Sequence, residues 1–221
     1  MHEQKPWLKF YGDIPEHIDY PRVTMVEALM QTVSRNPDAV AYDFFGYTAT
    51  YRQFGAEIDR CADALAALGL KQGDRITISM PTCPQGIICF YAANKLGAVA
   101  SMIHPLSPAK EIAFYLNTAK SRFALTLDAF YGKFKEVQDK TDLQTLILCR
   151  IPDYLPWIKK IGFNLTKGRK IPPVPEDKLV AWWSNLMRGN YPKAPKADMG
   201  TDETAVILFS GGTTGVPKGI M

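Results

Sequence analysis

Short apolar stretches alternate with longer stretches along the middle of the chain. The apolar, β-branched runs predict strands, and the longer stretches between them predict helices. Strands separated by helices of about a dozen residues form β-α-β units, which place their strands parallel in one sheet. The sequence therefore predicts an α/β fold, a mainly parallel sheet with helices on both faces. The predicted strands are residues 75–80, 98–103, 123–127 and 143–149, and the predicted helices are residues 84–96, 108–119 and 129–140.

Two capping boxes mark helix starts nearer the N-terminus. Thr24 is followed three residues later by Glu27, and Thr50 is followed three residues later by Gln53. In this pattern each side chain satisfies a backbone N–H group at the start of a helix. The second of these helices is predicted to end at Gly69, because glycine suits the position after a helix.

A short hairpin and a division of the chain into four regions can be predicted from the sequence. Residues 40–45 and 48–51 predict a short strand and its return, joined by a turn at Gly46 and Tyr47. The N-terminal region is rich in aromatic residues and proline, which predicts an arm lying on a core. The predicted regions are an arm at residues 1–22, an α/β subdomain at 23–149, a basic, aromatic and proline-rich insertion or linker at 150–203, and a strand with a loop that opens a further subdomain at 204–221.

Composition excludes several classes of protein. Hydrophobic residues make up 47% of the chain and charged residues 22%, which is typical of a globular protein. The longest apolar candidate, residues 86–103, is interrupted by Asn94 and Lys95, so no membrane span is expected. The N-terminus lacks the apolar core of a signal peptide. The four cysteines show no CxxC spacing, which predicts reduced thiols in a cytoplasmic protein, with no metal site and no disulfide.

The strongest functional signal lies at residues 204–221. An apolar run from Ala205 to Phe209 predicts a buried strand, and a loop rich in glycine and hydroxyl groups follows it. Glycines let backbone N–H groups approach a polyphosphate closely, hydroxyl groups donate to its oxygens, and Lys218 adds a positive charge. The loop matches neither the Walker A pattern nor G-x-G-x-x-G. A glycine- and threonine-rich surface turn is the alternative interpretation.

The same loop closely resembles the phosphate loop of the adenylate-forming enzymes, whose usual form is aromatic-[ST]-[ST]-G-[ST]-T-G-x-P-K-G. The stretch from Phe209 to Gly219 departs at Gly211, where a second hydroxyl residue is common. A Gly-Gly pair at this point is similar to the long-chain fatty acyl-CoA synthetases. Residues 22–149 resemble the same superfamily, in Gly73-Asp74-Arg75-Ile76, in residues 95–99 and in residues 103–108.

This resemblance implies a fold and a function. It implies part of the large amino-terminal domain of an acyl-CoA synthetase, which uses ATP and Mg²⁺ to convert a carboxylic acid, here a fatty acid, to an acyl-adenylate. The acyl group then passes to coenzyme A. The resemblance implies that the β- and γ-phosphates are held by the loop residues Ser210, Gly211, Gly212, Thr213, Thr214, Gly215 and Lys218.

The resemblance also implies that much of the machinery lies outside this sequence. The family's adenine-binding loop, its ribose-binding Asp and its catalytic Lys would follow Met221. We therefore expect a truncated chain with no catalytic residue and no activity of its own. Two alternatives stay open: an aryl- or amino-acid-adenylating ligase of the same superfamily, and a non-catalytic module that binds a membrane or a protein. His104 is a candidate base, but a histidine beside proline in a turn more often has a structural role.

Residues 150–197 form a basic segment. They hold ten Lys and Arg residues against three Asp and Glu residues, and three of the four tryptophans, Trp157, Trp182 and Trp183. Aromatic residues beside cations suit a membrane interface. They also suit nucleic acid, or a solvated linker packed over the edge of a domain. Of these, nucleic acid is the least favoured, and peripheral contact with the inner face of a membrane stays open beside the linker.

Overall fold

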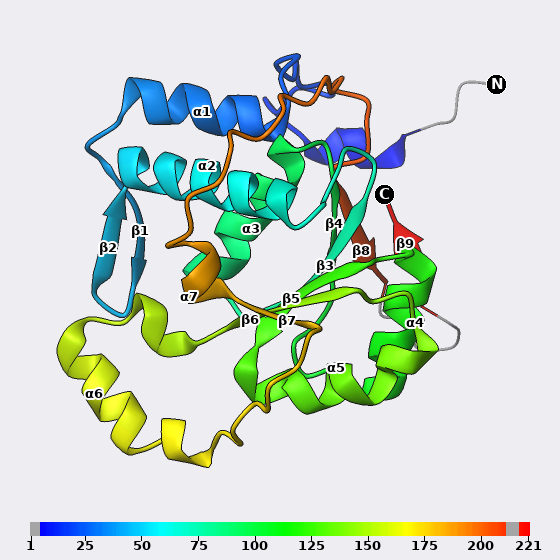
Figure 1. The fold of residues 1–221 in the computed structure, drawn as a ribbon. Coiled ribbons are helices and arrows are strands. Elements are labelled where there is room, and N and C mark those ends of the chain that lie inside the picture. The colour runs from blue at the N-terminus through cyan, green and yellow to red at the C-terminus, as the bar shows by residue number, and fades with distance from the viewer. Residues whose placement is uncertain (1–4, 211–216) are drawn as a thin grey trace.

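The computed structural model describes residues 5–210 and 217–221, and its centre is one twisted sheet (Figure 1). Within these residues the strand order is β7-β6-β5-β3-β4-β8-β9. All neighbouring pairs are parallel except β8 and β9. The predicted mainly parallel sheet is confirmed. The strands are β3 (Arg75–Ser79), β4 (Val99–Met102), β5 (Phe123–Leu127), β6 (Thr145–Cys149), β7 (Val180–Trp182), β8 (Val206–Phe209) and β9 (Gly219–Ile220).

Helices pack on both faces of this sheet. One face packs against α2 (Tyr51–Ala67) and α3 (Pro84–Lys95), with α1 (Met25–Arg35) outside them. The other face packs against α4 (Ala109–Ala119) and α5 (Tyr131–Val137). Neighbouring residues of one strand serve the two cores, because side chains alternate across a strand. Leu125 contributes to the first core and Ala124 to the second, and neither is exposed to solvent.

Local chemistry starts and stops the helices largely as predicted. Both capping boxes form: Thr24 and Glu27 cap α1, and Thr50 and Gln53 cap α2. After α3 the chain turns at Gly97, whose φ is +71°. A Cβ atom there would lie 2.8 Å from Gln72 Cγ and 2.9 Å from Met199 Sδ, so only glycine fits this turn without rearrangement.

The predicted helix at residues 129–140 is three shorter elements. The α5 helix lies between two 3₁₀ turns, Asp128–Phe130 and Gln138–Lys140. Side-chain bonds lie at the two ends of this stretch: Asp128 Oδ1 accepts from the N–H of Ala129 at 2.8 Å at the start of the first 3₁₀ turn, and the Thr141 hydroxyl, after the second 3₁₀ turn, donates to the carbonyl of Val137 at 3.1 Å. Such side-chain bonds compete with a continuous α-helix.

The short hairpin forms, with its turn one residue earlier than predicted. It comprises β1 (Val40–Phe44) and β2 (Tyr47–Thr50). The turn residues are Phe45 and Gly46, with φ of +54° and +86°. Positive φ at both positions is typical of the tight turns that suit the twist of paired strands. In the described part of the N-terminal arm, a 3₁₀ turn spans Pro6–Phe10, and most of the large apolar side chains are exposed, among them Trp7, Phe10 and Ile14.

The segment 150–203 contributes an edge strand and several helices. Its elements are a 3₁₀ turn (Ile151–Tyr154), α6 (Trp157–Leu165), a 3₁₀ turn (Gly168–Lys170), β7 and α7 (Trp183–Leu186). The sequence pattern did not predict β7, because three residues are too short a run to show alternation. The tryptophans have different environments: Trp183 is 2% exposed in the first core, whereas Trp157 is 72% exposed.

Asp177 fixes the start of β7 against α5. Its carboxylate accepts from the hydroxyl of Tyr131 at 2.8 Å and from the backbone N–H of Leu179 at 3.0 Å. Lys135 Nζ lies 2.9 Å from the same carboxylate. The Lys135 contact, followed by those of Leu179 and Tyr131, lowers the pKa of Asp177 from 3.8 to about 2. Contacts that favour the charged form stabilise the fold at neutral pH.

We predict that Asp177→Asn destabilises the protein at pH 7 by about 1–2 kcal/mol, since Lys135 is half exposed and screened. The folded pKa lies below the unfolded one, so this contribution is present above about pH 4 and is lost as pH falls through about 2. Urea unfolding at several pH values should show the difference from wild type shrinking over that window. Exposed Glu176→Gln is the control, and a difference independent of pH would contradict the assignment.

Candidate functional site

The loop with the strongest functional signal lies at the carboxyl edge of the parallel sheet. β3, β4 and β8 are parallel neighbours in the sheet, so their carboxyl ends meet at one edge. β8 ends at Phe209, and Ser210 begins the loop there. Open α/β sheets bind ligands outside the carboxyl ends of their strands. The fold therefore places the predicted phosphate loop where this kind of sheet binds ligands.

The two ends of the loop are tied together. The N–H of Ser210 donates to the carbonyl of Lys218 at 3.0 Å, and the N–H of Lys218 donates to Ser210 Oγ at 3.3 Å. Antiparallel pairing of Phe209 with Gly219 continues this closure into β8 and β9. Of the predicted phosphate-binding residues, Ser210 and Lys218 are thus brought together. The others lie outside the described residues: Gly211, Gly212, Thr213, Thr214 and Gly215.

Three contacts hold the strand that carries the loop. The side-chain amide of Asn94 donates to the carbonyl of Ala205 at 2.8 Å, and the N–H of Ala100 donates to the same carbonyl at 3.0 Å. At the other end of β8, the rings of Phe209 and Tyr115 lie 4.4 Å apart between centroids. Asn94, which interrupts the apolar run in the sequence, therefore connects α3 to β8.

His104 lies beside this loop and makes a local hydrogen bond. It follows β4, in which Met102 pairs with Leu208 of β8, so His104 and Ser210 each stand two residues beyond that pair. Nδ1 of His104 accepts from the backbone N–H of Leu106 at 3.2 Å, and the residue is exposed. This bond stabilises the turn after β4, which fits a structural role for His104.

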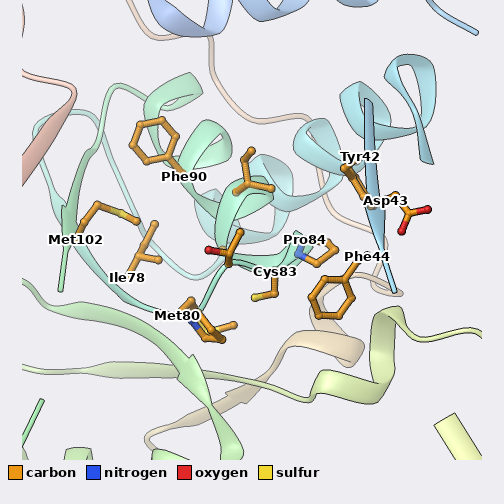
Figure 2. Close-up of a pocket in the computed structure, with 13 residues that line it drawn as sticks. Tyr42, Asp43, Phe44, Ile78, Met80, Cys83, Pro84, Phe90 and Met102 are labelled. Carbon is orange, nitrogen blue, oxygen red and sulfur yellow. The ribbon is translucent and has the colours of Figure 1, made fainter. Parts of the chain in front are cut away.

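A cavity of about 350 Å³ lies near the carboxyl end of β3, between α3 and the β1–β2 hairpin (Figure 2). Its lining is mainly apolar, and Figure 2 shows Met80, Cys83 and Phe44 around it. Met102 also lines it, and Met102 pairs with Leu208 of β8. The cavity thus borders β4, the strand next to β8, which carries the loop. Sequence reasoning missed it, because its walls come from β1, β3, β4 and α3, and no local pattern records their meeting.

Two polar groups of the cavity wall are held largely uncharged. The hydroxyl of Tyr42 donates to Glu57 Oε2 at 2.7 Å, and burial, then that carboxylate, raises the pKa of Tyr42. Burial raises the pKa of the Cys83 thiol. The backbone N–H groups of Gly86 and Gln85 favour the thiolate and lower this pKa, but their effect is smaller. Asp43 also lines the cavity, but most of the wall is apolar or uncharged, which favours a largely apolar occupant because burying an unpaired charge is costly.

A model of the AMP-binding enzyme family matches residues 29–221. The chain belongs to this family. A long-chain-fatty-acid–CoA ligase of Bacillus subtilis (strain 168) is 31% identical over an alignment of 227 positions, which covers 100% of this chain and 40% of that protein. A 3-hydroxypropionyl-coenzyme A synthetase of Sulfurisphaera tokodaii is 34% identical over 174 residues, 78% of this chain and 25% of that protein.

Among solved structures, the inhibitor-bound N-terminal domain of FACL13 from Mycobacterium tuberculosis superposes with a TM-score of 0.68 at 26% identity. The match covers 89% of this chain and 43% of that one. The fold is therefore that of the N-terminal domain of an adenylate-forming enzyme, as the resemblance implied. The chain spans less than half the length of the relatives it matches.

We predict that Cys83 reacts with N-ethylmaleimide more slowly than a free thiol, but faster than the fully buried Cys89, because it borders the cavity. The thiolate is the reactive form, and burial raises the pKa of Cys83 above the usual 9.0. Its labelling rate should therefore still be rising at pH 9. Peptide mapping by mass spectrometry measures this, with Cys83→Ala as the control. A rate that levels off below pH 8 would contradict the buried environment.

Proposed function

We propose that this chain forms the part that binds the ATP phosphates in a ligase that activates a carboxylic acid with ATP and joins it to coenzyme A. One observation carries the proposal. A glycine- and threonine-rich loop, closed at its base by Ser210 and Lys218, leaves the carboxyl edge of the sheet in a member of the AMP-binding enzyme family. An acyl-adenylate intermediate makes chemical sense, because a carboxylate oxygen leaves only after it has been converted to a better leaving group.

The proposed role of the loop is to hold and orient the β- and γ-phosphates, with no covalent step. Negative charge gathers on the departing pyrophosphate, and preorganised donors and cations stabilise it. The Ser210 hydroxyl and the Lys218 ammonium are of the chemical types that fit such an anion. The proposed set also includes Gly211, Gly212, Thr213, Thr214 and Gly215. Within residues 5–210 and 217–221 no group of His, Cys, Asp and Glu side chains that could hold a metal ion is found, so we assign no ligand to Mg²⁺.

The proposed acid is a long-chain fatty acid. Two observations support this choice: the match to the Bacillus subtilis ligase extends over the whole of this chain, and an apolar cavity is lined by Met102 of β4, the strand that pairs with the loop-bearing β8. The competing acid class is a short or aryl acid, or an amino acid, and the Sulfurisphaera tokodaii relative favours a short one. Comparing palmitate, 3-hydroxypropionate, coumarate and amino acids as substrates discriminates between these classes.

We propose that the protein is cytoplasmic and contacts the inner face of a membrane peripherally through residues 150–197.

The non-enzymatic alternative is a binding module that keeps the fold without catalysis. The catalytic and non-catalytic proposals differ in one measurement, which is ATP-dependent adenylation by the longest protein that contains this sequence. Adenylation of any acid by that protein would reject the module.

We predict that the 221 residues by themselves do not form acyl-adenylate. They span 40% of the Bacillus subtilis relative, and we propose that adenine, ribose and the carboxylate are bound mainly by the remaining portion of such an enzyme. Pyrophosphate exchange with palmitate, coumarate or amino acids should stay at background, with the longest protein containing this sequence as the positive control. Robust exchange by the 221-residue chain would refute the prediction.

We predict that Lys218→Ala, in the longest protein that contains this sequence, raises the KM for ATP or slows adenylation by roughly 10- to 150-fold. A charge-assisted bond to a phosphate oxygen contributes about 1.5–3 kcal/mol, which corresponds to that range. Thermal stability should be nearly unchanged, because Lys218 is exposed. The matched control is Lys71→Ala, because Lys71 is also exposed but precedes β3, at the amino ends of the parallel strands. An unaltered dependence on ATP would exclude the proposed role of Lys218.

A further inference from the structure

The helix α6 shows an apolar face to solvent. Trp157, Ile158, Ile161 and Leu165 are 72%, 64%, 52% and 56% exposed. Their spacing of one, four and eight residues from Trp157 places all four on one side of an α-helix. Single exposed apolar side chains are ordinary, but a contiguous set of four large ones marks an interaction surface. We call these four residues the α6 apolar face.

The opposite side of α6 attaches the helix to the protein. Lys159 Nζ donates to the carbonyl of Phe45 at 2.7 Å, at the tip of the β1–β2 hairpin. Phe163, one turn further along, is half-buried and lines a cavity together with Trp182. In Figure 1, α6 lies at the periphery of the fold, below the hairpin. The attachment therefore orients the helix so that its apolar face points away from the body.

The surroundings of the α6 apolar face are basic. Residues 154–175 contain no Asp or Glu. Five cations lie in the same stretch, and all five are exposed: Lys159, Lys160, Lys167, Arg169 and Lys170. Basic side chains flanking an apolar helix face that includes tryptophan are typical of helices that lie in the interface of an anionic bilayer. No helix in the described ranges is long and apolar enough to cross a membrane.

We infer that α6 is a membrane-docking helix, whose apolar face enters the interface of an anionic lipid surface while Lys160, Lys167, Arg169 and Lys170 contact the lipid phosphates. Charge complementarity selects this occupant over a second copy of the chain, because two copies would bring two basic surfaces together. The inference locates the membrane contact proposed above. It is independent of the proposed ligase activity, because lipid binding is measured without ATP, acid or coenzyme A.

Vesicle sedimentation tests this inference. The 221-residue protein should sediment with phosphatidylcholine vesicles that contain phosphatidylserine, and much less with pure phosphatidylcholine vesicles. Binding should weaken at least roughly tenfold between about 50 and 300 mM salt, because salt screens charges outside the protein interior. The paired change Ile158→Ser and Ile161→Ser should weaken binding roughly tenfold or more, through the loss of apolar burial. Circular dichroism checks that the variants stay folded.

Matched controls separate α6 from the rest of the surface. Trp7 is also exposed but lies on a different element, so the Trp7→Ser variant should bind vesicles like wild type. The Trp157→Ser variant should bind them more weakly. Changing Lys160, Lys167, Arg169 and Lys170 to Gln should abolish binding, whereas changing the exposed Lys71, Lys120 and Lys140 to Gln should leave most of it.

A second measurement reports insertion directly. Brominated lipid chains should quench tryptophan fluorescence in wild type and not in Trp157→Phe. Three results would overturn the inference: no binding at low salt, binding that the α6 changes leave intact, or loss of binding in the longest protein that contains this sequence. The last result would mean that another part of that protein covers the α6 apolar face.

Discussion

The pairing of β8 with β4 is the contact on which the candidate site depends. Val206 pairs with Ala100, so two segments far apart in the sequence become neighbours in the sheet. Bringing residues 100 and 206 together closes a long loop, which costs conformational entropy. The strand hydrogen bonds and the bond from the Asn94 amide to the carbonyl of Ala205 offset this cost. Without this pairing, Ser210 and Lys218 would still be close in sequence, but they would have no fixed place at the carboxyl edge of the sheet.

The sequence predicted those elements that are determined locally. Thr24 and Thr50 cap their helices as expected, because a capping box needs only residues three positions apart. The strands β3, β4, β5 and β6 were predicted because each is an apolar run of several residues. β7 was missed, because its three residues are specified by Asp177, Tyr131 and Lys135, which lie far apart in the sequence.

The candidate site was predictable to a similar extent. The order of residues from Phe209 to Gly219 was sufficient to predict the family, which the family match to residues 29–221 bears out. The phosphate-binding role of the loop stays a prediction. The apolar cavity was not predictable, because Phe44, Ile78 and Met102 come from three different strands. Likewise, three tryptophans in one basic segment looked alike in sequence. Trp183 is buried in the core and Trp157 faces solvent, because α7 folds against the sheet and α6 does not.

The brevity of β7 has a consequence for how the protein behaves in concentrated solution. β7 is the terminal strand of the sheet on that side, and terminal strands carry unpaired backbone groups that can recruit another chain. A strand of three residues offers too short a template for stable pairing, and the chain leaves the sheet at once into α7. The Asp177 contacts and the burial of Trp183 keep it from lengthening. This edge of the sheet is thereby protected against edge-to-edge aggregation.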